Sequence, residues 1–423
     1  MRYSDRPISL PQDDALGRAP FSLALANAID NLAVANDGFV IGLIGEWGSG
    51  KSSVAELTIR YLRHVDMIRA CGEDEDVPSI FDLEAMADAF SRVEHLIDDF
   101  LERNLDVQLW NKHHRDRQFR IQCGSTEDTE LALRYWDLLR RLEEKPRNIV
   151  VRFSPWLFPG KAELASALLS DLARVVGEKL GDDVRKAFAS VLNRLSNVVP
   201  IVGAATDVVA QAGLGGLFSA GVDVSNRLAK RMTDGPTVES VRARLRKKLG
   251  RSNRTKILVV VDDLDRLTPD EAVEMVSLLK GLGDLPNVVY LLCYDEVRLG
   301  SLISTSFNVD GHEYLQKIVQ YPIHLPPLEP PEILNLLNAD LESLVTNWST
   351  VATRRLNIAW FLTLSRYIGT PRDVRRLMNS FSVALSGVGS HTDPVDLLLL
   401  ETLRIHEPAV YHWLRRNYND LAV

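Results

Sequence analysis

The sequence predicts an α/β fold in which helices cover both faces of a parallel sheet, with helical insertions and a C-terminal helical domain. Two observations support this prediction. Short apolar runs alternate with segments whose apolar residues recur at helical spacing, and the first apolar run leads directly into a glycine-rich loop. Strands buried on both faces are continuous apolar runs, and their alternation with helices is typical of parallel sheets.

Five apolar runs fit the strands of such a sheet. In chain order they are 39–44, 148–153, 256–261, 287–293 and 321–325. Helical spacing is expected between them in six segments. These are 54–65, 90–101, 131–142, 161–180, 238–249 and 270–282. Four prolines between 326 and 331 then mark a linker, and the pattern beyond them is helical to the C-terminus.

Length and composition indicate an ordinary globular protein of more than one unit. Its 423 residues exceed what one hydrophobic core normally serves, and 25% of them are charged. A net charge of −8 argues against nucleic acid as the main partner. Cys71, Cys123 and Cys293 lack the spacing of a zinc site or a disulfide framework, and residues 1–10 do not resemble a signal peptide. We therefore expect a cytoplasmic location.

One segment, 198–224, complicates a soluble interpretation because it is long, nearly uncharged and rich in small residues. It contains Asp207 and Asp223, and an aspartate at the centre of a membrane helix costs about 2.5 to 3.5 kcal/mol, whereas each Val or Leu returns only about 0.3 to 0.6. A buried hairpin or a helical insertion is therefore favoured. Membrane contact through 198–224, with peripheral attachment at the inner face of the membrane, stays an alternative.

Residues 45–52, GEWGSGKS, match the phosphate-binding pattern GxxxxGK[ST] and stand between a predicted strand and a predicted helix. Glycines let the backbone curl until its N–H groups point at phosphates, and the helix start adds its positive dipole end. We expect Lys51 to reach the β- and γ-phosphates and the Ser52 hydroxyl to ligate Mg²⁺. The predicted nucleotide-binding residues of this loop are Gly45, Glu46, Trp47, Gly48, Ser49, Gly50, Lys51, Ser52 and Ser53.

Carboxylates follow the third apolar run, at the strand end where open α/β sheets bind ligands. Asp262 is predicted to hold Mg²⁺ through water, because a hard dication prefers oxygen ligands. Asp263 is predicted to polarise the attacking water. Asp265 is either a second base or a structural partner of Arg266. The predicted catalytic residues are thus Lys51, Asp263, Asp265 and Arg266, the alternative being a solvated acidic turn.

Several motifs in this order resemble the KAP family of P-loop NTPases, a branch of the additional-strand division that includes AAA+ and STAND proteins. They are DALGR at 14–18 with Phe21, the loop 45–52, FSPW at 153–156, DDLDR at 262–266, YLQKIVQ at 314–320 and GTPR at 369–372. The resemblance implies a sheet of order 5-1-4-3-2, and it places Gly17 and Arg18 near adenine and Arg372 as a second-sensor arginine. Asp295 falls near the first-sensor position. Without the resemblance, these residues are an exposed turn and a helix start.

The chain departs from the family pattern at two points. Family members commonly carry transmembrane helices between the P-loop and the third strand, where this chain has only 198–224. Ser154 stands where the family often has asparagine or aspartate, and Trp156 with Phe158 has the alternative of being core aromatics. Membrane anchoring is therefore in doubt.

Six segments follow from these assignments. They are 1–71 (N-terminal segment and first half of the NTPase core), 72–147 (helical insertion), 148–181 (second strand and helix of the core), 182–254 (apolar and basic helical insertion), 255–328 (Walker B and sensor strands) and 329–423 (C-terminal helical lid domain).

The expected activity is Mg-dependent hydrolysis of ATP by a nucleotide-driven switch or assembly factor, plausible in anti-phage defence by analogy with related prokaryotic proteins. ATP is favoured over GTP because CYDE, not an NKxD-type motif, stands at 293–296. A homo-oligomer and protein partners are expected, with an arginine supplied in trans from Arg266, Arg375 or Arg376. The alternatives are a nucleotide-binding scaffold with little hydrolysis, a kinase, and a DNA-stimulated ATPase that uses the basic cluster 242–248.

Overall fold

The structure is a computed structural model of the 423-residue chain. It describes residues 6–189 and 255–418, except 9, 35–36, 72–79, 105–106, 108–109, 145–146, 159, 187, 284, 308, 346–347 and 389–391; between 190 and 254 only 243 and 247 are described. The apolar segment 198–224 and nearly all of the basic helix predicted at 238–249 therefore lie outside the described residues. Within the described residues, none of the helices combines the length and the apolar content that a membrane span requires.

Five strands form one parallel sheet. They are β1 (Phe39–Ile44), β2 (Asn148–Phe153), β3 (Lys256–Val261), β4 (Val288–Tyr294) and β5 (Tyr321–His324). The sheet has the order β2-β3-β4-β1-β5, which is the predicted order 5-1-4-3-2 counted from the opposite edge. The α/β fold class and the strand order are confirmed, and all five strands present their carboxyl ends at the same edge of the sheet.

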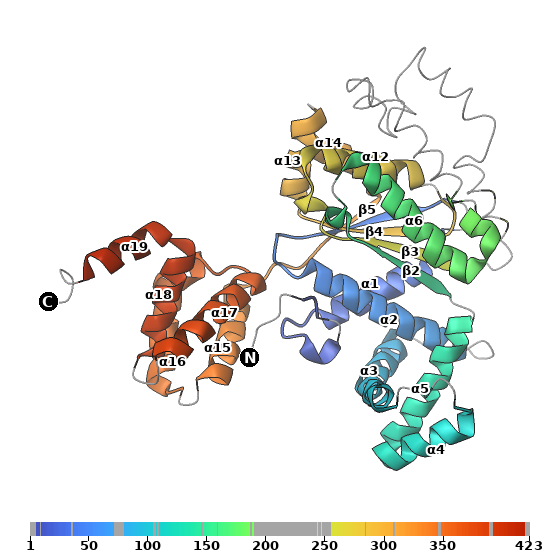
Figure 1. The fold of residues 1–423 in the computed structure, drawn as a ribbon, viewed down its shortest axis with the longest axis horizontal. Coiled ribbons are helices and arrows are strands. Elements are labelled where there is room, and N and C mark those ends of the chain that lie inside the picture. Colours follow the sequence, from blue (N-terminus) through green and yellow to red (C-terminus); the bar gives the residue numbers. More distant parts are fainter. Residues whose placement is uncertain are drawn as a thin grey trace.

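Successive residues of each central strand pack into opposite layers, as a strand with period two requires. Val259 and Val261 belong to the core on one face, while Leu258 and Val260 belong to the core on the other. Figure 1 shows α1 (Ala19–Asn31) and α2 (Lys51–Cys71) below the sheet, and α6 (Lys161–Leu180), α12 (Pro269–Leu282), α13 (Glu296–Phe307) and α14 (Gly311–Gln316) above it. The sheet is thus covered on both sides, which explains its apolar strands.

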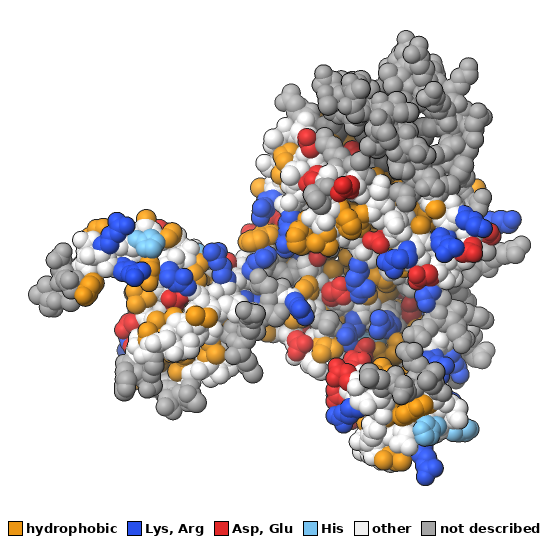
Figure 2. Space-filling model, viewed as in Figure 1, with side chains coloured by type: hydrophobic (Ala, Val, Ile, Leu, Met, Phe, Trp, Pro, Cys, Tyr) orange, Lys and Arg blue, Asp and Glu red, His pale blue; other side chains and the backbone are white. Residues whose placement is uncertain are grey.

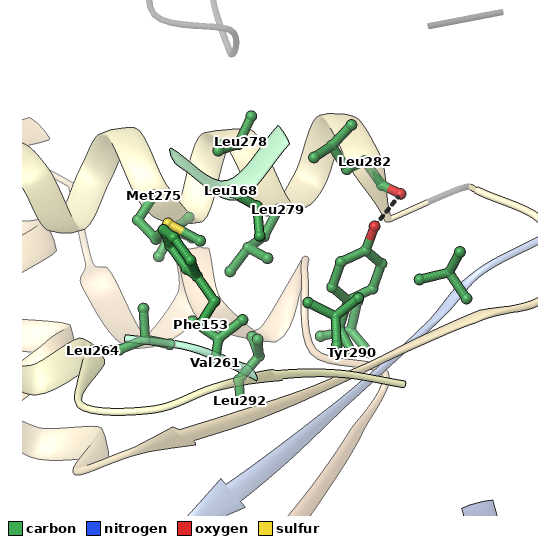
Figure 3. Close-up of a cluster of buried hydrophobic side chains, with 14 of the residues drawn as sticks. Phe153, Leu168, Val261, Leu264, Met275, Leu278, Leu279, Leu282, Tyr290 and Leu292 are labelled. Carbon is green, nitrogen blue, oxygen red and sulfur yellow. Dashed lines mark hydrogen bonds between the residues drawn. The ribbon is translucent and has the colours of Figure 1, made fainter. Parts of the chain in front are cut away.

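The upper core is closed by α12, whose side chains meet β3 and β4. Figure 3 shows Met275 and Leu279 of this helix pointing toward Phe153 and Val261 on the sheet. At the other end of the helix, the Tyr290 hydroxyl donates a hydrogen bond of 2.9 Å to the Leu282 carbonyl, so this buried polar group is satisfied.

Helix α12 begins at Pro269 with a capping box. The Thr268 hydroxyl accepts from the Glu271 amide, and the Glu271 carboxylate accepts from the Thr268 amide at 3.0 Å. Such a cap stabilises a helix by about 1 kcal/mol. Glu271 also accepts a hydrogen bond of 2.9 Å from the Gly160 amide, so the cap fixes the turn after β3 against the start of α6.

A second group of helices follows α2 and falls within the predicted insertion 72–147. It consists of α3 (Ile80–Arg103), α4 (Lys112–Cys123) and α5 (Glu127–Glu144), which share a core with the end of α2. Glu94 of α3 forms an ion pair with Arg60 of α2 and lies 3.6 Å from His64. Although burial alone would raise the pKa of Glu94, its contacts with His64 and Arg60 lower it to about 2. The buried Glu94 carboxylate therefore joins α3 of the insertion to α2 of the core through its ion pair with Arg60.

The C-terminal helices build a separate core beyond the proline-rich linker. They are α15 (Pro330–Leu344), α16 (Thr350–Leu362), α17 (Pro371–Val388) and α18 (Pro394–His406), and α19 (Pro408–Arg416) follows them without contributing a residue to this core. Figure 1 shows them as a group beside the sheet. The start of α17 is the part of this group that the contacts below place against the phosphate loop.

Candidate nucleotide-binding and catalytic site

The glycine-rich loop is curled around the side chain of Lys51, the first residue of α2. Gly48 and Gly50 have φ values of +86° and +99°, which side chains other than glycine rarely adopt. The Lys51 ammonium is largely buried and donates to the carbonyls of Gly45 and Glu46, both at 2.9 Å. The structure thus places Lys51 inside the turn, with the first turn of a 21-residue helix beginning at the same point.

The loop offers a buried polar atom that no protein group satisfies. The Ser49 hydroxyl oxygen is buried and makes no hydrogen bond within the described part of the chain. A buried hydroxyl without a partner costs about 1 to 3 kcal/mol, so such groups in folded proteins call for a ligand or water. Together with the two left-handed glycines and the lysine, this fits a phosphate cradle. Ser53 differs, since its hydroxyl accepts a hydrogen bond of 3.2 Å from the Ile8 amide.

Ser52 and Asp262 meet across the space between α2 and β3. The Ser52 side chain lies near enough to the Asp262 carboxylate to influence its pKa, and the Asp263 amide donates to Asp262 Oδ1 at 2.8 Å. Burial raises the pKa of Asp262 above its ordinary value, and the nearby Ser52 side chain acts against this shift. A hydroxyl and a carboxylate beside a phosphate-binding loop are the oxygen ligands that Mg²⁺ prefers, so these two residues fit the predicted metal site.

Asp263 has a left-handed backbone, with φ of 61° and ψ of 33°. This conformation costs roughly 1 kcal/mol or more in a residue with a side chain. Its Oδ1 lies 2.7 Å from Nε of Arg266, whose guanidinium carbon stands 5.4 Å from the centre of the Trp156 ring. Burial and the neighbouring Asp262 raise the pKa of Asp263. The carboxylate predicted to polarise water is therefore held by an arginine of its own chain.

Asp265 lies apart from this ion pair. Its side chain is buried, and Oδ2 finds no hydrogen-bond partner within the described residues. Arg266 forms an ion pair with Asp263, three residues before it, and the sequence analysis did not predict this pair. The i,i+3 spacing of the two opposite charges could have indicated the ion pair.

Residues after β4 and at the start of α17 also reach the loop. Asp295 Oδ2 accepts a hydrogen bond of 3.1 Å from the Trp47 amide, which brings the predicted first-sensor position to the phosphate loop. The guanidinium carbon of Arg372 lies 4.1 Å from the centre of the Trp47 ring. Arg372, the predicted second-sensor arginine, therefore lies at the phosphate loop. Its guanidinium packs over the Trp47 ring, a contact that the sequence did not predict.

Gly17 and Arg18 occupy the turn before α1, and Gly17 has a φ of +64°. Arg18 is buried and donates a hydrogen bond of 2.6 Å from Nη2 to the Pro326 carbonyl, while its Nη1 has no hydrogen-bond partner among the described residues. Burial lowers the pKa of Arg18, and the charges of Glu332 and Asp14 act against this shift. Arg18 therefore connects the N-terminal segment with the linker that leads to the C-terminal helices.

The fold and the loop define a P-loop NTPase: a parallel sheet in which the first strand leads through GEWGSGKS into a helix, and in which β3, two places away in the sheet, is followed by two aspartates. Residues 18–388 match the KAP family P-loop domain. Since this match spans most of the chain, the chain belongs to the KAP family of P-loop NTPases.

A relative among characterised proteins is the "Phage T7 exclusion protein" of Escherichia coli strain K12. It is 27% identical over 310 residues, a match that covers 67% of this chain and 40% of that protein. The chain therefore spans less than half of the length of this relative.

Two solved structures from Aeropyrum pernix are also similar, each at 12% identity. The ORC2 protein, solved as ADPNP-ADP complexes, has a TM-score of 0.40, with 95% of this chain and 70% of that chain covered. The ORC1 protein in complex with DNA has a TM-score of 0.35, with 95% and 66% covered.

Proposed function

We propose that the chain is a Mg-dependent ATPase whose bound triphosphate organises a closed or oligomeric state that hydrolysis releases. The observation that carries this proposal is the loop curled around Lys51, with Ser52 near enough to Asp262 to lower the pKa of its carboxylate. A hydroxyl, a half-buried carboxylate and a lysine near one another at the carboxyl end of a sheet are the groups needed to bind a metal-complexed triphosphate.

Each residue has one task in this proposal. Lys51 moves from the two loop carbonyls to the phosphate oxygens, because these carry more charge and bind the ammonium more strongly. Ser52 and Asp262 hold the metal, and Mg²⁺ supplies neutralisation of the charge that develops on the phosphates. Asp263 accepts the proton of the attacking water once its carboxylate is released from Arg266.

Removal of the metal tests this proposal. We expect phosphate release from ATP by the purified protein to fall to the background rate with excess EDTA and to return with added Mg²⁺. Ser52→Ala removes one oxygen ligand, so it should raise the Mg²⁺ concentration for half-maximal activity by about tenfold, which corresponds to one lost charge-assisted interaction. Ser91→Ala in α3 is the matched control. Turnover that persists at full rate in EDTA would contradict the metal role.

A second prediction concerns assembly. If an arginine of a neighbouring copy completes the site, the specific activity should rise steeply with protein concentration. We expect this rise in the wild type and its loss in Arg375→Ala or Arg376→Ala when one of these residues supplies the charge. Turnover measured over a hundredfold range of protein concentration, with the molecular mass determined at each, decides the point. A constant specific activity would leave activation within one chain as the mechanism.

The biological setting we propose is exclusion of phage, supported by the similarity to the phage exclusion protein. Because the match covers 40% of that protein, the activity and partners of the relative come to this chain only as proposals. Restriction of phage growth by the wild-type gene, and its absence in a Lys51 variant, is the experiment that tests it.

The ion pair between Asp263 and Arg266 favours a second candidate function. The arginine at 2.7 Å occupies the Asp263 carboxylate and keeps it from an attacking water, so the protein in this form suits a nucleotide-binding scaffold with little hydrolysis. Tight binding of Mg-ATP without phosphate release, at any protein concentration, would support the scaffold.

A DNA-stimulated ATPase is less supported. On the face shown in Figure 2, basic and acidic side chains are interspersed over the core, and the cluster 242–248 lies almost wholly outside the described residues. Stimulation of turnover by DNA, with binding that weakens sharply as salt rises, would favour it.

A further inference from the structure

Trp47 lies in the phosphate loop, and its ring is close to two arginines from different parts of the chain. The guanidinium carbon of Arg372 is 4.1 Å from the ring centre, and that of Arg298 is 5.6 Å from it. A cation above the face of an indole is attracted by the negative face of the ring, and tryptophan gives the strongest contact of this kind. The ring is still 42% exposed, so its burial in a core does not explain its position.

The backbone of Trp47 is fixed to the nucleotide-binding core. Its amide donates to Asp295 Oδ2 at 3.1 Å, and the other oxygen of Asp295 accepts from the Arg298 amide at 3.1 Å. Asp295 directly follows β4, at the carboxyl edge of the sheet. The ring is therefore a fixed platform on the core side, and Arg372 reaches it from the C-terminal helices.

The loop and α17 also approach each other closely at Gly48, next to Trp47. A Cβ at Gly48 would lie 3.0 Å from Thr370 Oγ1 and 3.1 Å from the Cβ of Arg372, closer than most side-chain contacts. The Thr370 hydroxyl in turn donates to Asp373 at 2.8 Å, which holds the start of α17 in shape. The absence of a side chain at Gly48 thus admits the residue whose guanidinium stacks on Trp47.

We propose that Trp47 is the positioning residue of Arg372: its ring holds the guanidinium at the phosphate loop, so that the C-terminal helices respond to a bound triphosphate and less to a diphosphate. The inference rests on the proposed function, because it requires that the loop binds nucleotide. It adds one specific contact to that function: the Trp47 ring on the core holds Arg372 of α17 in the position where its guanidinium faces the terminal phosphate.

A double-mutant cycle tests this role. Dissociation constants of Mg-ATP and Mg-ADP are measured by calorimetry for the wild type, Trp47→Ala, Arg372→Ala and the double variant. Loss of the ring should weaken Mg-ATP binding by about two- to fivefold, the range of an exposed cation–π contact. In the Arg372→Ala background, Trp47→Ala should have no further effect, since the side chain that it positions is already gone. Mg-ADP affinity should fall less than Mg-ATP affinity in each variant, because the diphosphate lacks the terminal phosphate that Arg372 faces.

Conservative variants separate positioning from general loss of structure. Trp47→Phe keeps an aromatic face and should retain most of the Mg-ATP affinity. Arg372→Gln repeats the cycle with a neutral side chain of similar length, in case the alanine variant unfolds. Trp413→Ala on α19 removes a tryptophan of similar exposure, 55%, and should act independently of Arg372.

Two results would overturn the role of Trp47. The first is an equal loss of Mg-ATP affinity on Trp47→Ala in both backgrounds, and the second is tighter Mg-ATP binding by Trp47→Ala, which would mean that the ring withholds Arg372 from the phosphates. Both arise in a protein that binds Mg-ATP, so the proposed function survives them. A wild type without affinity for Mg-ATP would instead overturn the proposed function and this role with it.

Discussion

Replacement of Asp263 by asparagine is expected to lower the rate of ATP hydrolysis by about 100-fold or more while leaving Mg-ATP affinity nearly unchanged. The substitution keeps the shape of the side chain but removes the basic oxygen, and a positioned general base contributes roughly 10²- to 10⁴-fold to the rate. The Asp262 carboxylate and the Ser52 hydroxyl are untouched, so metal and phosphate binding should persist. Single-turnover phosphate release and equilibrium binding, measured on the same preparation, check both halves.

The matched control is Asp128→Asn, an exposed carboxylate in the first turn of α5 and outside the site. It should hydrolyse ATP at the wild-type rate. Equal rates for wild type and Asp263→Asn would remove Asp263 as the base and turn attention to Asp265. A large loss of nucleotide affinity in Asp263→Asn would mean that its ion pair with Arg266 shapes the loop itself.

The second large effect is expected from Lys51→Ala. Loss of the ammonium removes charge-assisted hydrogen bonds to the phosphates, each worth about 1.5 to 3 kcal/mol, so Mg-ATP affinity should fall by about 100-fold. Hydrolysis should become undetectable. The thermal unfolding temperature of the variant should be close to that of the wild type, because the lysine is replaced in a turn that glycines shape.

Lys186→Ala, an exposed lysine beyond α6, is the control and should bind Mg-ATP as the wild type does. If the Lys51 variant keeps full affinity while folded, the lysine is not the phosphate ligand. Such a result would be incompatible with the proposed mechanism and would leave the curled loop as a purely structural turn.

The strands were the most predictable part of the fold. Residues 39–44, 148–153 and 256–261 form β1, β2 and β3 with the expected bounds, since buried strands are unbroken apolar runs. β4 begins one residue later than predicted, because Asn287 adopts a positive φ of 60° and makes a turn before the strand. β5 ends at His324, one residue early.

Helix bounds were less predictable. α2 runs from Lys51 to Cys71, whereas the spacing indicated only 54–65. The apolar spacing begins at residue 54, after the first turn of the helix. The residues of that first turn, 51–53, belong to the phosphate-binding motif and do not follow the apolar spacing. α3 begins at Ile80, ten residues before the expected 90, in a part of the chain where acidic residues obscured the period.

Within the candidate site, the sequence predicted the residues that lie in short motifs, but it did not predict contacts between residues far apart in the chain. The glycines and Lys51 carry a signature at fixed spacing, and so do the aspartates after β3. The stack of Arg372 on Trp47 joins residues from opposite ends of the chain, and no periodicity or motif connects them. Only the folded arrangement of the core and α17 brings these two side chains together.

In the proposed function, the loop around Lys51 holds a metal-complexed triphosphate. Calorimetric titration of the folded wild-type protein with ATP, in the presence and absence of Mg²⁺, tests it most directly. We predict a single site per chain that binds ATP more tightly with the metal present. A folded protein that shows no affinity for ATP or any other Mg-triphosphate would mean that the loop around Lys51 is not a nucleotide site.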